Sequence, residues 1–337
     1  MAQKIIRTVC AFTDNLTNDT ITKVKDVHSQ LEKQGYIIQT KRICVDTKNF
    51  QPLKLFDDGS IFLSLGTLTP QEAPQILSDF YASKNVSFNI DLTNEDITQK
   101  HTQILFDVIQ NKPSKTFNFT YVFNNSHSSP FFPSATYNTN SYSIGLQPTD
   151  LAEGCESIDE WLESMKTIWN EIHTLFSNDP DFLGIDSSIA PLFQGSSSFI
   201  NFIRRLGIAF PQSTTTDIYM KITKFIKAEN PKPIGLNGLM FPCLEDFELA
   251  EEYEKGEFSI ERNVYLSLHS GLGIDTYPIA VDEEKERVVD ILKLVQGFSN
   301  KYKKPLSARF VSDGKSKLGE KTDFQHQYLK DVVLRSL

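Results

Sequence analysis

The 337-residue chain lacks several features that would point to common classes of protein. It has no apolar run long enough to span a bilayer, and its first residues lack the hydrophobic stretch of a secretory signal. Lys and Arg are scattered and the formal net charge is −9, which argues against a nucleic-acid partner. These absences predict a cytoplasmic protein whose partners include neither a membrane nor a nucleic acid.

Cysteine is scarce, and two common cofactor signatures are missing. The four cysteines lie too far apart in sequence for a zinc-knuckle or thioredoxin spacing: Cys10, Cys44, Cys155 and Cys243. We expect four reduced, mostly buried thiols. A glycine-rich fingerprint is absent after the first predicted strand, where residues 11–15 read Ala-Phe-Thr-Asp-Asn, and this argues against a Rossmann nucleotide site.

What the chain does have is an alternation of strand and helix patterns. Expected strands cover residues 5–12, 36–45, 61–65, 86–92, 116–123, 141–146, 182–185, 264–268, 274–280 and 306–311. Expected helices cover residues 18–34, 70–83, 94–110, 158–176, 198–206, 216–227, 244–255 and 283–301. This order predicts a single large α/β domain over residues 1–337, barrel-like and with mainly parallel strands. An open doubly wound sheet is the alternative.

The phrase Leu-Gly-Ile-Asp occurs twice, ending at Asp186 and at Asp275, and a looser copy ends at Asp91. Each copy is a short apolar run that stops at a carboxylate, as a buried strand does where it enters a functional loop. We expect the three aspartates to gather at one end of the sheet. There Asp186 and Asp275 would hold a divalent metal, bind a cationic substrate or act as acid and base. The alternative is that each carboxylate only caps the turn after its strand.

Residues 124–140 are rich in Asn, Ser, Pro and aromatic residues and have no helical period. His127 lies just past a strand, which suits an imidazole that faces a substrate, and long irregular loops in compact domains are often functional. The alternative is a surface loop whose phenylalanines pin it to the body of the protein. An exposed apolar surface around Phe131 and Phe132 would instead predict an interface in a homo-oligomer.

The remaining candidates lie in the C-terminal third of the chain. His269 precedes the second Leu-Gly-Ile-Asp phrase, and Arg309 near a strand end could hold an anionic substrate group. The alternatives are an ordinary turn and a solvated basic turn. Cys243 precedes an acidic helix that begins near Glu245 and Asp246. These carboxylates oppose the low thiol pKa that a nucleophile needs, and we expect them to complement the helix N-terminus.

Six segments of the chain form a recognisable series. Four of them read Ser-Pro-Phe-Phe-Pro-Ser-Ala (129–135), Gly-Ile-Asp-Ser-Ser-Ile-Ala-Pro (184–191), Gly-Leu-Met-Phe-Pro (238–242) and Gly-Ile-Asp-Thr-Tyr-Pro-Ile (273–279). The other two are residues 4–9 and 308–319. Together they resemble the uncharacterised family called domain of unknown function 711, in its archaeal-type branch. The resemblance implies a large α/β barrel similar to pyruvate formate-lyase and the anaerobic ribonucleotide reductases, but no established activity.

The resemblance does not imply radical chemistry. Glycyl-radical enzymes carry a C-terminal motif similar to Arg-Val-x-Gly-Tyr, and residues 309–314 lack the aromatic residue after glycine. The chain also has no adjacent cysteine pair for a thiyl radical. A non-radical site is therefore expected.

Two hypotheses about function remain, and both require a small-molecule ligand. The first is an enzyme of small-molecule metabolism, a hydrolase or lyase with an acid–base or metal-assisted site at the strand ends. His127 or His269 would move protons, Asp186 and Asp275 would orient the substrate or hold the metal, and Arg309 would bind an anionic group. The second is a non-catalytic ligand-binding or regulatory protein on the same scaffold. A pocket lined by aromatic and hydroxyl groups, with the histidines turned away, would favour the second.

Overall fold

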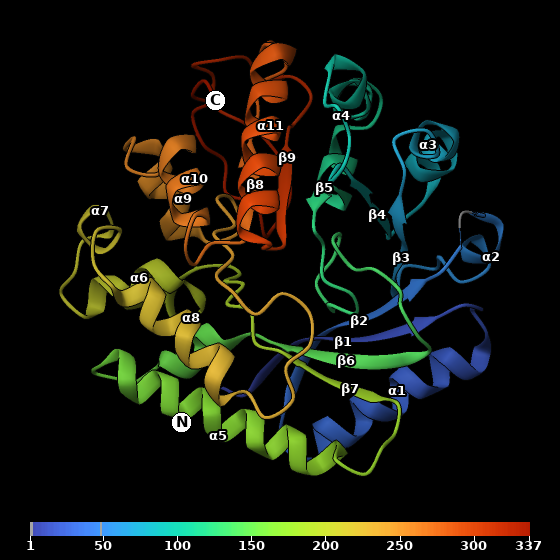
Figure 1. Ribbon diagram of the computed structural model, residues 1–337, viewed down its shortest axis with the longest axis vertical. Helices are drawn as coiled ribbons and strands as arrows, with labels where there is room; N and C mark the ends of the chain where they lie inside the picture. Colours follow the sequence, from blue (N-terminus) through green and yellow to red (C-terminus); the bar gives the residue numbers. More distant parts are fainter. Residues whose placement is uncertain (1–2, 48) are drawn as a thin grey trace.

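The computed structural model describes residues 3–47 and 49–337, and within these ranges nine strands form one sheet (Figure 1). The strands are β1 Ile5–Thr13, β2 Ile37–Val45, β3 Phe62–Leu68, β4 Val86–Asp91, β5 Phe119–Phe123, β6 Ser141–Leu146, β7 Phe182–Asp186, β8 Gly273–Pro278 and β9 Leu306–Val311. Their order across the sheet is β7-β6-β1-β2-β3-β4-β5-β9-β8. The predicted α/β class is confirmed.

Helices fill most of the connections between the strands. The α-helices are α1 Asn18–Lys33, α2 Gln51–Lys54, α3 Ala73–Ala82, α4 Gln99–Asn111, α5 Ile158–Phe176, α6 Phe199–Arg205, α7 Phe210–Ser213, α8 Ile218–Glu229, α9 Phe247–Glu254, α10 Ile260–Ser267 and α11 Lys285–Tyr302. Short 3-10 helices are η1 Pro113–Asn118, η2 Pro148–Ala152 and η3 Gly195–Ser197. In the described part of the chain, no helix is long and apolar enough to cross a membrane.

The sheet consists of two sets of parallel strands that run in opposite directions. Strands β1 to β5 are parallel, while β6 pairs antiparallel with β1 and β9 pairs antiparallel with β5. Because β7 is parallel to β6 and β8 to β9, the four later strands all run opposite to the first five. The predicted mainly parallel pairing is confirmed within each set. The two reversals leave no trace in hydrophobic patterns, which look the same in either strand direction.

The strands in the described ranges do not close into a barrel, because no ladder joins the edge strands β7 and β8. Residues 233–242 instead contact both edges through isolated bridges. They bridge to Ile185 and Ile189 on the β7 side and to Gly271 and Asp275 on the β8 side. The predicted barrel-like closure is thus not confirmed, and the two edges are linked by an irregular segment.

Helices and loop cover different faces of the sheet. Apolar side chains at helical spacing form a buried stripe on α5, which packs against β7, while α1 contacts β1 and β2, and α11 contacts β5 and β9. On the other face of β1 and β2, Cys10, Phe12 and Cys44 form a separate small core with the loop that joins β5 to β6. A doubly wound sheet would carry helices there, so this face argues against that alternative.

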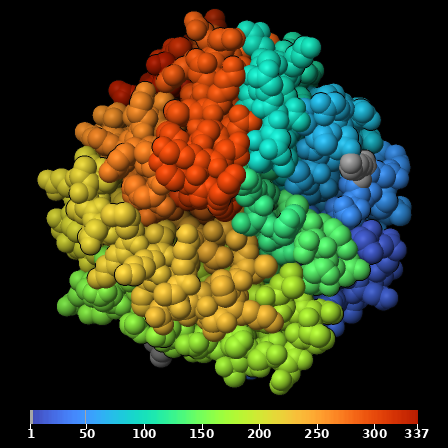
Figure 2. Space-filling view, in the orientation of Figure 1, coloured from blue at the N-terminus to red at the C-terminus, as the bar shows by residue number. Residues whose placement is uncertain are grey.

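The loop between β5 and β6 is irregular, as predicted, and folds into this second face. The side-chain amide of Asn89 donates to the carbonyl oxygens of Pro133 and Ala135, each at 3.0 Å. At its start the loop packs against α11, where Asn124 donates to Ser299 Oγ at 2.9 Å. In the space-filling view, the green surface of the loop region lies beside the orange-red surface of α11 (Figure 2). Polar side chains of β4 and α11 therefore fix the loop in place.

The expected exposed apolar surface on this loop is wrong. Phe131 is only 4% exposed and packs beside Gly145. The ring of Phe132 lies 5.1 Å from the guanidinium carbon of Arg42 on β2. Phe131 is buried and the half-buried ring of Phe132 packs on Arg42, so the two do not form the exposed apolar patch that an interface here would need.

The predicted strand over residues 264–268 is also wrong, because this segment is the end of α10. Ser259 caps the helix by accepting a hydrogen bond from the backbone N–H of Arg262 at 3.3 Å. Val264 and Leu266 are both buried. A short apolar run fits a buried strand and a buried helix equally well, and here the upstream cap decides for the helix.

Close backbone contact explains the glycine of the repeated Leu-Gly-Ile-Asp phrase. Gly184 and Gly273 have φ of +147° and +106°, and a Cβ at either position would collide with the carbonyl oxygen of Lys232 or Ser307. We expect Gly273→Ala to lower the free energy of unfolding by about 2–3 kcal/mol, because strained φ and a backbone collision act together. Urea denaturation measures this change.

A second glycine provides the control. Gly297 lies in α11, and a Cβ there would meet open space. Gly297→Ala is expected to raise the free energy of unfolding by about 0.5–1 kcal/mol, because alanine favours the helix. Equal effects of the two substitutions would contradict the close-contact explanation.

Candidate functional site

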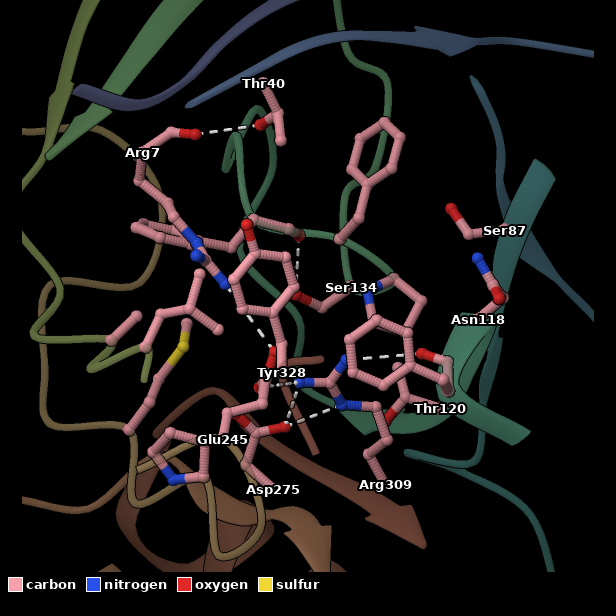
Figure 3. Close-up of a pocket in the computed structure, with 18 of the residues that line it drawn as sticks. Arg7, Thr40, Ser87, Asn118, Thr120, Ser134, Glu245, Asp275, Arg309 and Tyr328 are labelled. Carbon is pink, nitrogen blue, oxygen red and sulfur yellow. Dashed lines mark hydrogen bonds and ion pairs between the residues drawn. The ribbon is translucent and has the colours of Figure 1, made fainter. Parts of the chain in front are cut away.

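A cavity of about 380 Å³ lies on the sheet face that carries the β5–β6 loop. Side chains from both sets of strands line it, together with residues 131–134 of the loop, residues 190–192 after β7 and residues 326–328 near the C-terminus (Figure 3). Segments from both ends of the chain therefore meet at one concave site, which is the usual setting for a small-molecule ligand.

A buried ion-pair network forms one wall of the cavity. Arg309 on β9 donates from Nε to Asp275 on β8 at 2.7 Å and from Nη2 to Glu245 at 2.9 Å (Figure 3). Arg7 on β1 lies 3.6 Å from the other oxygen of Glu245. Burial alone would lower the pKa of Arg309, but the two carboxylates outweigh it and raise that pKa above its ordinary value. Burial raises the pKa of Glu245, and Arg309 opposes this shift.

Irregularities in two strands lie at Asp275 and at Arg7, whose side chains line the cavity. The β8–β9 register shifts between Ile274 and Tyr277, and Thr276 has a φ of +39°, which is strained for a β-branched residue. Arg7 lies where the β1–β6 register shifts between Ile6 and Thr8. Strain of this kind persists where the surrounding structure requires it, often at binding sites.

Arg42 brings to the cavity a positive charge that no carboxylate contacts directly, although Glu245 attracts it from a distance. Its side chain is buried, its Nε donates to Thr40 Oγ1 at 3.0 Å, and its Nη1 donates to the carbonyl oxygen of Pro130 at 3.2 Å. Within residues 3–47 and 49–337, no acidic side chain forms an ion pair with it. Burial, and then the nearby Arg7, lower the pKa of Arg42 to about 9, so the guanidinium is still charged at neutral pH.

The cavity therefore has an excess of positive charge. Three guanidinium groups, those of Arg7, Arg42 and Arg309, face two carboxylates, those of Glu245 and Asp275. In the described part of the chain, Arg7 Nε is also buried without a hydrogen-bond partner. A buried charge and an unpaired donor are costly unless something compensates them, and an anionic ligand would do so.

Of the five predicted site residues, the structure brings together Asp275 and Arg309. His127 is exposed on the β5–β6 loop and does not line the cavity. His269 is half-buried, contacts Ser270 Oγ at 3.1 Å and also lies outside the cavity lining. Partial burial, and then the charge of Lys304, lower the pKa of His269, so its imidazole is neutral at pH 7. Neither histidine is placed to move a proton in this cavity.

Asp186 is a structural crosslink. It is fully buried, and its carboxylate accepts hydrogen bonds from Ser129 Oγ at 2.8 Å, Ser188 Oγ at 2.6 Å and the backbone N–H of Leu236 at 2.9 Å. The backbone N–H groups of Ser188 and Asn237 donate to it as well. Burial raises the pKa of Asp186. The carboxylate joins the β5–β6 loop, the end of β7 and residues 233–242.

The residues present do not fit the expected divalent metal. The partners of Asp186 are hydroxyl and backbone donors, while Asp275 is ion-paired with Arg309 in the cavity, so the two predicted ligands do not share a site. Across the two described ranges, no three side chains of His, Cys, Asp or Glu are grouped so that they could hold a metal ion. We therefore derive no step through a metal.

The expectation that three aspartates gather at one end of the sheet is wrong. β4 and β7 do end at Asp91 and Asp186, as predicted, but β8 continues past Asp275 to Pro278. β4 runs in the opposite direction to β7 and β8. Its carboxyl end therefore lies where β7 and β8 begin, at the opposite end of the strands. Asp91 is exposed and accepts a hydrogen bond from the backbone N–H of Thr93 at 2.8 Å. It caps its turn, as the alternative reading predicted.

Sequence reasoning missed Arg7, Arg42 and the role of Glu245. The only local signal is a charged residue within a strand pattern, which is ambiguous without the partner strands. Glu245 was expected to complement the next helix, but Asp246 is the cap of α9 and Glu245 faces the cavity. Cys243 is fully buried, and burial raises its thiol pKa well above the ordinary value, which argues against a nucleophile.

Comparison with known proteins places the chain in a family. A family model described as Uncharacterised ACR (DUF711) matches residues 69–325, and the chain belongs to this family, as predicted. A search of curated proteins found no similar protein. Among solved structures, the chain is similar to the Actinobacillus ureae class Id ribonucleotide reductase alpha subunit. That similarity has 9% sequence identity, covers 93% of this chain and 85% of that one, and has a TM-score of 0.46.

Proposed function

We propose that this protein binds a small anionic molecule in the cavity, with Arg7 and Arg42 as the groups that hold its charge. The observation that carries the proposal is the excess of one buried guanidinium over the carboxylates that line the same cavity. Arg309 is committed to Asp275 and Glu245, so it orients the network and leaves the other two arginines for the ligand. Planar guanidinium groups suit carboxylate and phosphate oxygens.

The lining supports the ligand-binding hypothesis over the one that uses His127 and His269. Phenylalanine side chains and hydroxyl groups of Ser87 and Thr120 line the cavity, and both predicted histidines lie outside it. This is the arrangement expected of a protein that binds a metabolite for regulation or transport rather than one that moves protons through those histidines.

A second candidate function, a non-radical hydrolase or lyase, is supported by His326. This residue lines the cavity, and its Nδ1 accepts the backbone N–H of Tyr328 at 3.2 Å, which assigns the imidazole proton to Nε2. Partial burial lowers the pKa of His326, so the neutral ring can donate or accept a proton at neutral pH. Incubating a bound ligand with the protein and following it by NMR separates the two functions, since only an enzyme converts it.

The finer assignments are also proposals. We propose that the fold is of the pyruvate formate-lyase type, and the bridges from residues 233–242 to both edge strands support this. We also propose that the chain belongs to the archaeal-type branch of its family. A cytoplasmic location and a homo-oligomer stay predictions.

Thermal denaturation against paired compounds tests the proposed function. Each pair has a carboxylic or phosphoric acid and its neutral amide or alcohol, such as benzoate with benzamide. We expect the melting temperature to rise with the anions of suitable shape and not with their neutral partners, because only the anion compensates Arg42. Equal shifts for both members of every pair, or none for any anion, would contradict the proposal.

A further inference from the structure

We propose that the anion bound in the cavity also carries uncharged hydroxyl groups, as a sugar phosphate or sugar acid does. The inference rests on the proposed function and concerns the other end of the ligand. Ser87, Asn118 and Thr120 also line the cavity, and Figure 3 shows Ser87 and Asn118 on the side away from Arg7 and Glu245, with Thr120 beside Arg309. β4 and β5 bring these residues together, because Phe88 pairs with Phe119 and the preceding residues are Ser87 and Asn118.

The two hydroxyl groups on this wall present only acceptors to a ligand. Ser87 Oγ donates its proton to the carbonyl oxygen of Leu63 at 3.2 Å. Thr120 Oγ1 donates to the carbonyl oxygen of Tyr121 at 3.1 Å. Each oxygen then has lone pairs but no proton for the cavity, so a ligand group beside it must be a hydrogen-bond donor. A fully ionised carboxylate or phosphate has no proton to donate, so it cannot satisfy these two oxygens.

Asn118 adds a free donor to this wall, and Gln39 adds one beside Arg7. Among the described residues, the side-chain amide of Asn118 has no hydrogen-bond partner. The Gln39 side chain accepts from Arg7 Nη1 at 3.2 Å through its oxygen, and its NH₂ group is left for a ligand. Asn118 therefore adds a donor beside the acceptor oxygens of Ser87 and Thr120, while Gln39 offers its donor at the Arg7 end of the cavity.

A hydroxyl group matches this combination because it both donates and accepts through one atom. An ammonium group would also donate, but the excess positive charge of the cavity disfavours it. Phe62, which also lines the cavity, offers an apolar face to the C–H groups of a polyol chain or ring. Charge at one end and hydroxyl recognition at the other define a polyhydroxy anion.

Isothermal titration of the full chain tests this inference with four probes. Ribose 5-phosphate and gluconate carry hydroxyls with a phosphate or a carboxylate, whereas phenyl phosphate and hexanoate carry the same charges without them. We expect at least one hydroxylated anion to bind about tenfold or more tightly than its partner, the effect of one or two hydrogen bonds. Whether ribose 5-phosphate or gluconate binds more tightly shows whether the ligand's charged group is a phosphate or a carboxylate.

Asn118→Leu is expected to remove this preference while leaving the affinity for phenyl phosphate or hexanoate unchanged. Asn111→Leu, at an exposed position of α4, is the matched control and should keep the preference for hydroxylated anions. Thr120→Val, which keeps the side-chain shape, is the second variant and should reduce the preference severalfold if Asn118→Leu fails to fold.

The outcomes separate the inference from the proposed function. Equal affinities for hydroxylated and plain anions in the unmodified protein, or a preference that survives both cavity variants, would overturn the inference alone. Failure of all four probes to bind would overturn the proposed function.

Discussion

Arg42→Met is expected to weaken binding of the anion in the cavity by about 10- to 150-fold, as loss of a charge-assisted hydrogen bond worth about 1.5–3 kcal/mol predicts. The same substitution is expected to leave the free energy of unfolding within about 1 kcal/mol of the unmodified protein, or to raise it. Removing a buried charge that has no direct ion-pair partner relieves a desolvation cost. Titration calorimetry measures the dissociation constant and urea denaturation measures the stability.

Arg309→Met is the matched control for this prediction. It would leave Glu245 and Asp275 buried without the guanidinium that neutralises them. We expect it to lower the free energy of unfolding by about 3–5 kcal/mol, the cost of breaking a buried ion pair on one side. An unchanged dissociation constant for Arg42→Met, or a loss of stability as large as that of Arg309→Met, would contradict the assignment of Arg42 to the ligand.

Asp186→Asn is expected to lower the free energy of unfolding by about 3 kcal/mol or more. The buried carboxylate accepts hydrogen bonds from two serine hydroxyls and three backbone N–H groups. An amide NH₂ in place of one oxygen would face donors and leave buried N–H groups unsatisfied. Urea denaturation at constant pH measures the change.

Asp91→Asn provides a matched control at the end of another strand. Asp91 also caps its own turn, but it is exposed, so we expect a loss below about 1 kcal/mol. If Asp186→Asn were as stable as the unmodified protein and bound the anion far more weakly, Asp186 would belong to the binding site after all. The crosslinking role would then be wrong.

Local sequence patterns predict much of the fold. The helix expected over residues 158–176 has the bounds of α5, because its apolar spacing is strong and Ser157 caps it. The strand ends at Asp91 and Asp186 are confirmed for a similar reason, since a carboxylate after an apolar run favours a turn. The strand predicted over residues 264–268 is wrong because five apolar-rich residues contain too little periodicity to distinguish a strand from a helix.

The site is less predictable because its geometry is non-local. Arg7 and Arg309 lie at opposite ends of the sequence, and they share Glu245 only because the strands reverse direction twice. Register shifts in β1 and β8 then turn side chains into the cavity, and no residue pattern specifies them. The phrase that ends at Asp275 marks a true lining residue, whereas its copy at Asp186 marks a crosslink.

Anomalous diffraction from a crystal soaked in selenate tests whether Arg7 and Arg42 bind an anion in the cavity. Selenate is a tetrahedral dianion, and its selenium atom gives a signal that fixes its position. The account predicts a selenium peak in the cavity within hydrogen-bond distance of both Arg7 and Arg42. Selenate peaks confined to the surface, with the cavity free of them in a crystal whose solvent reaches it, would contradict the account.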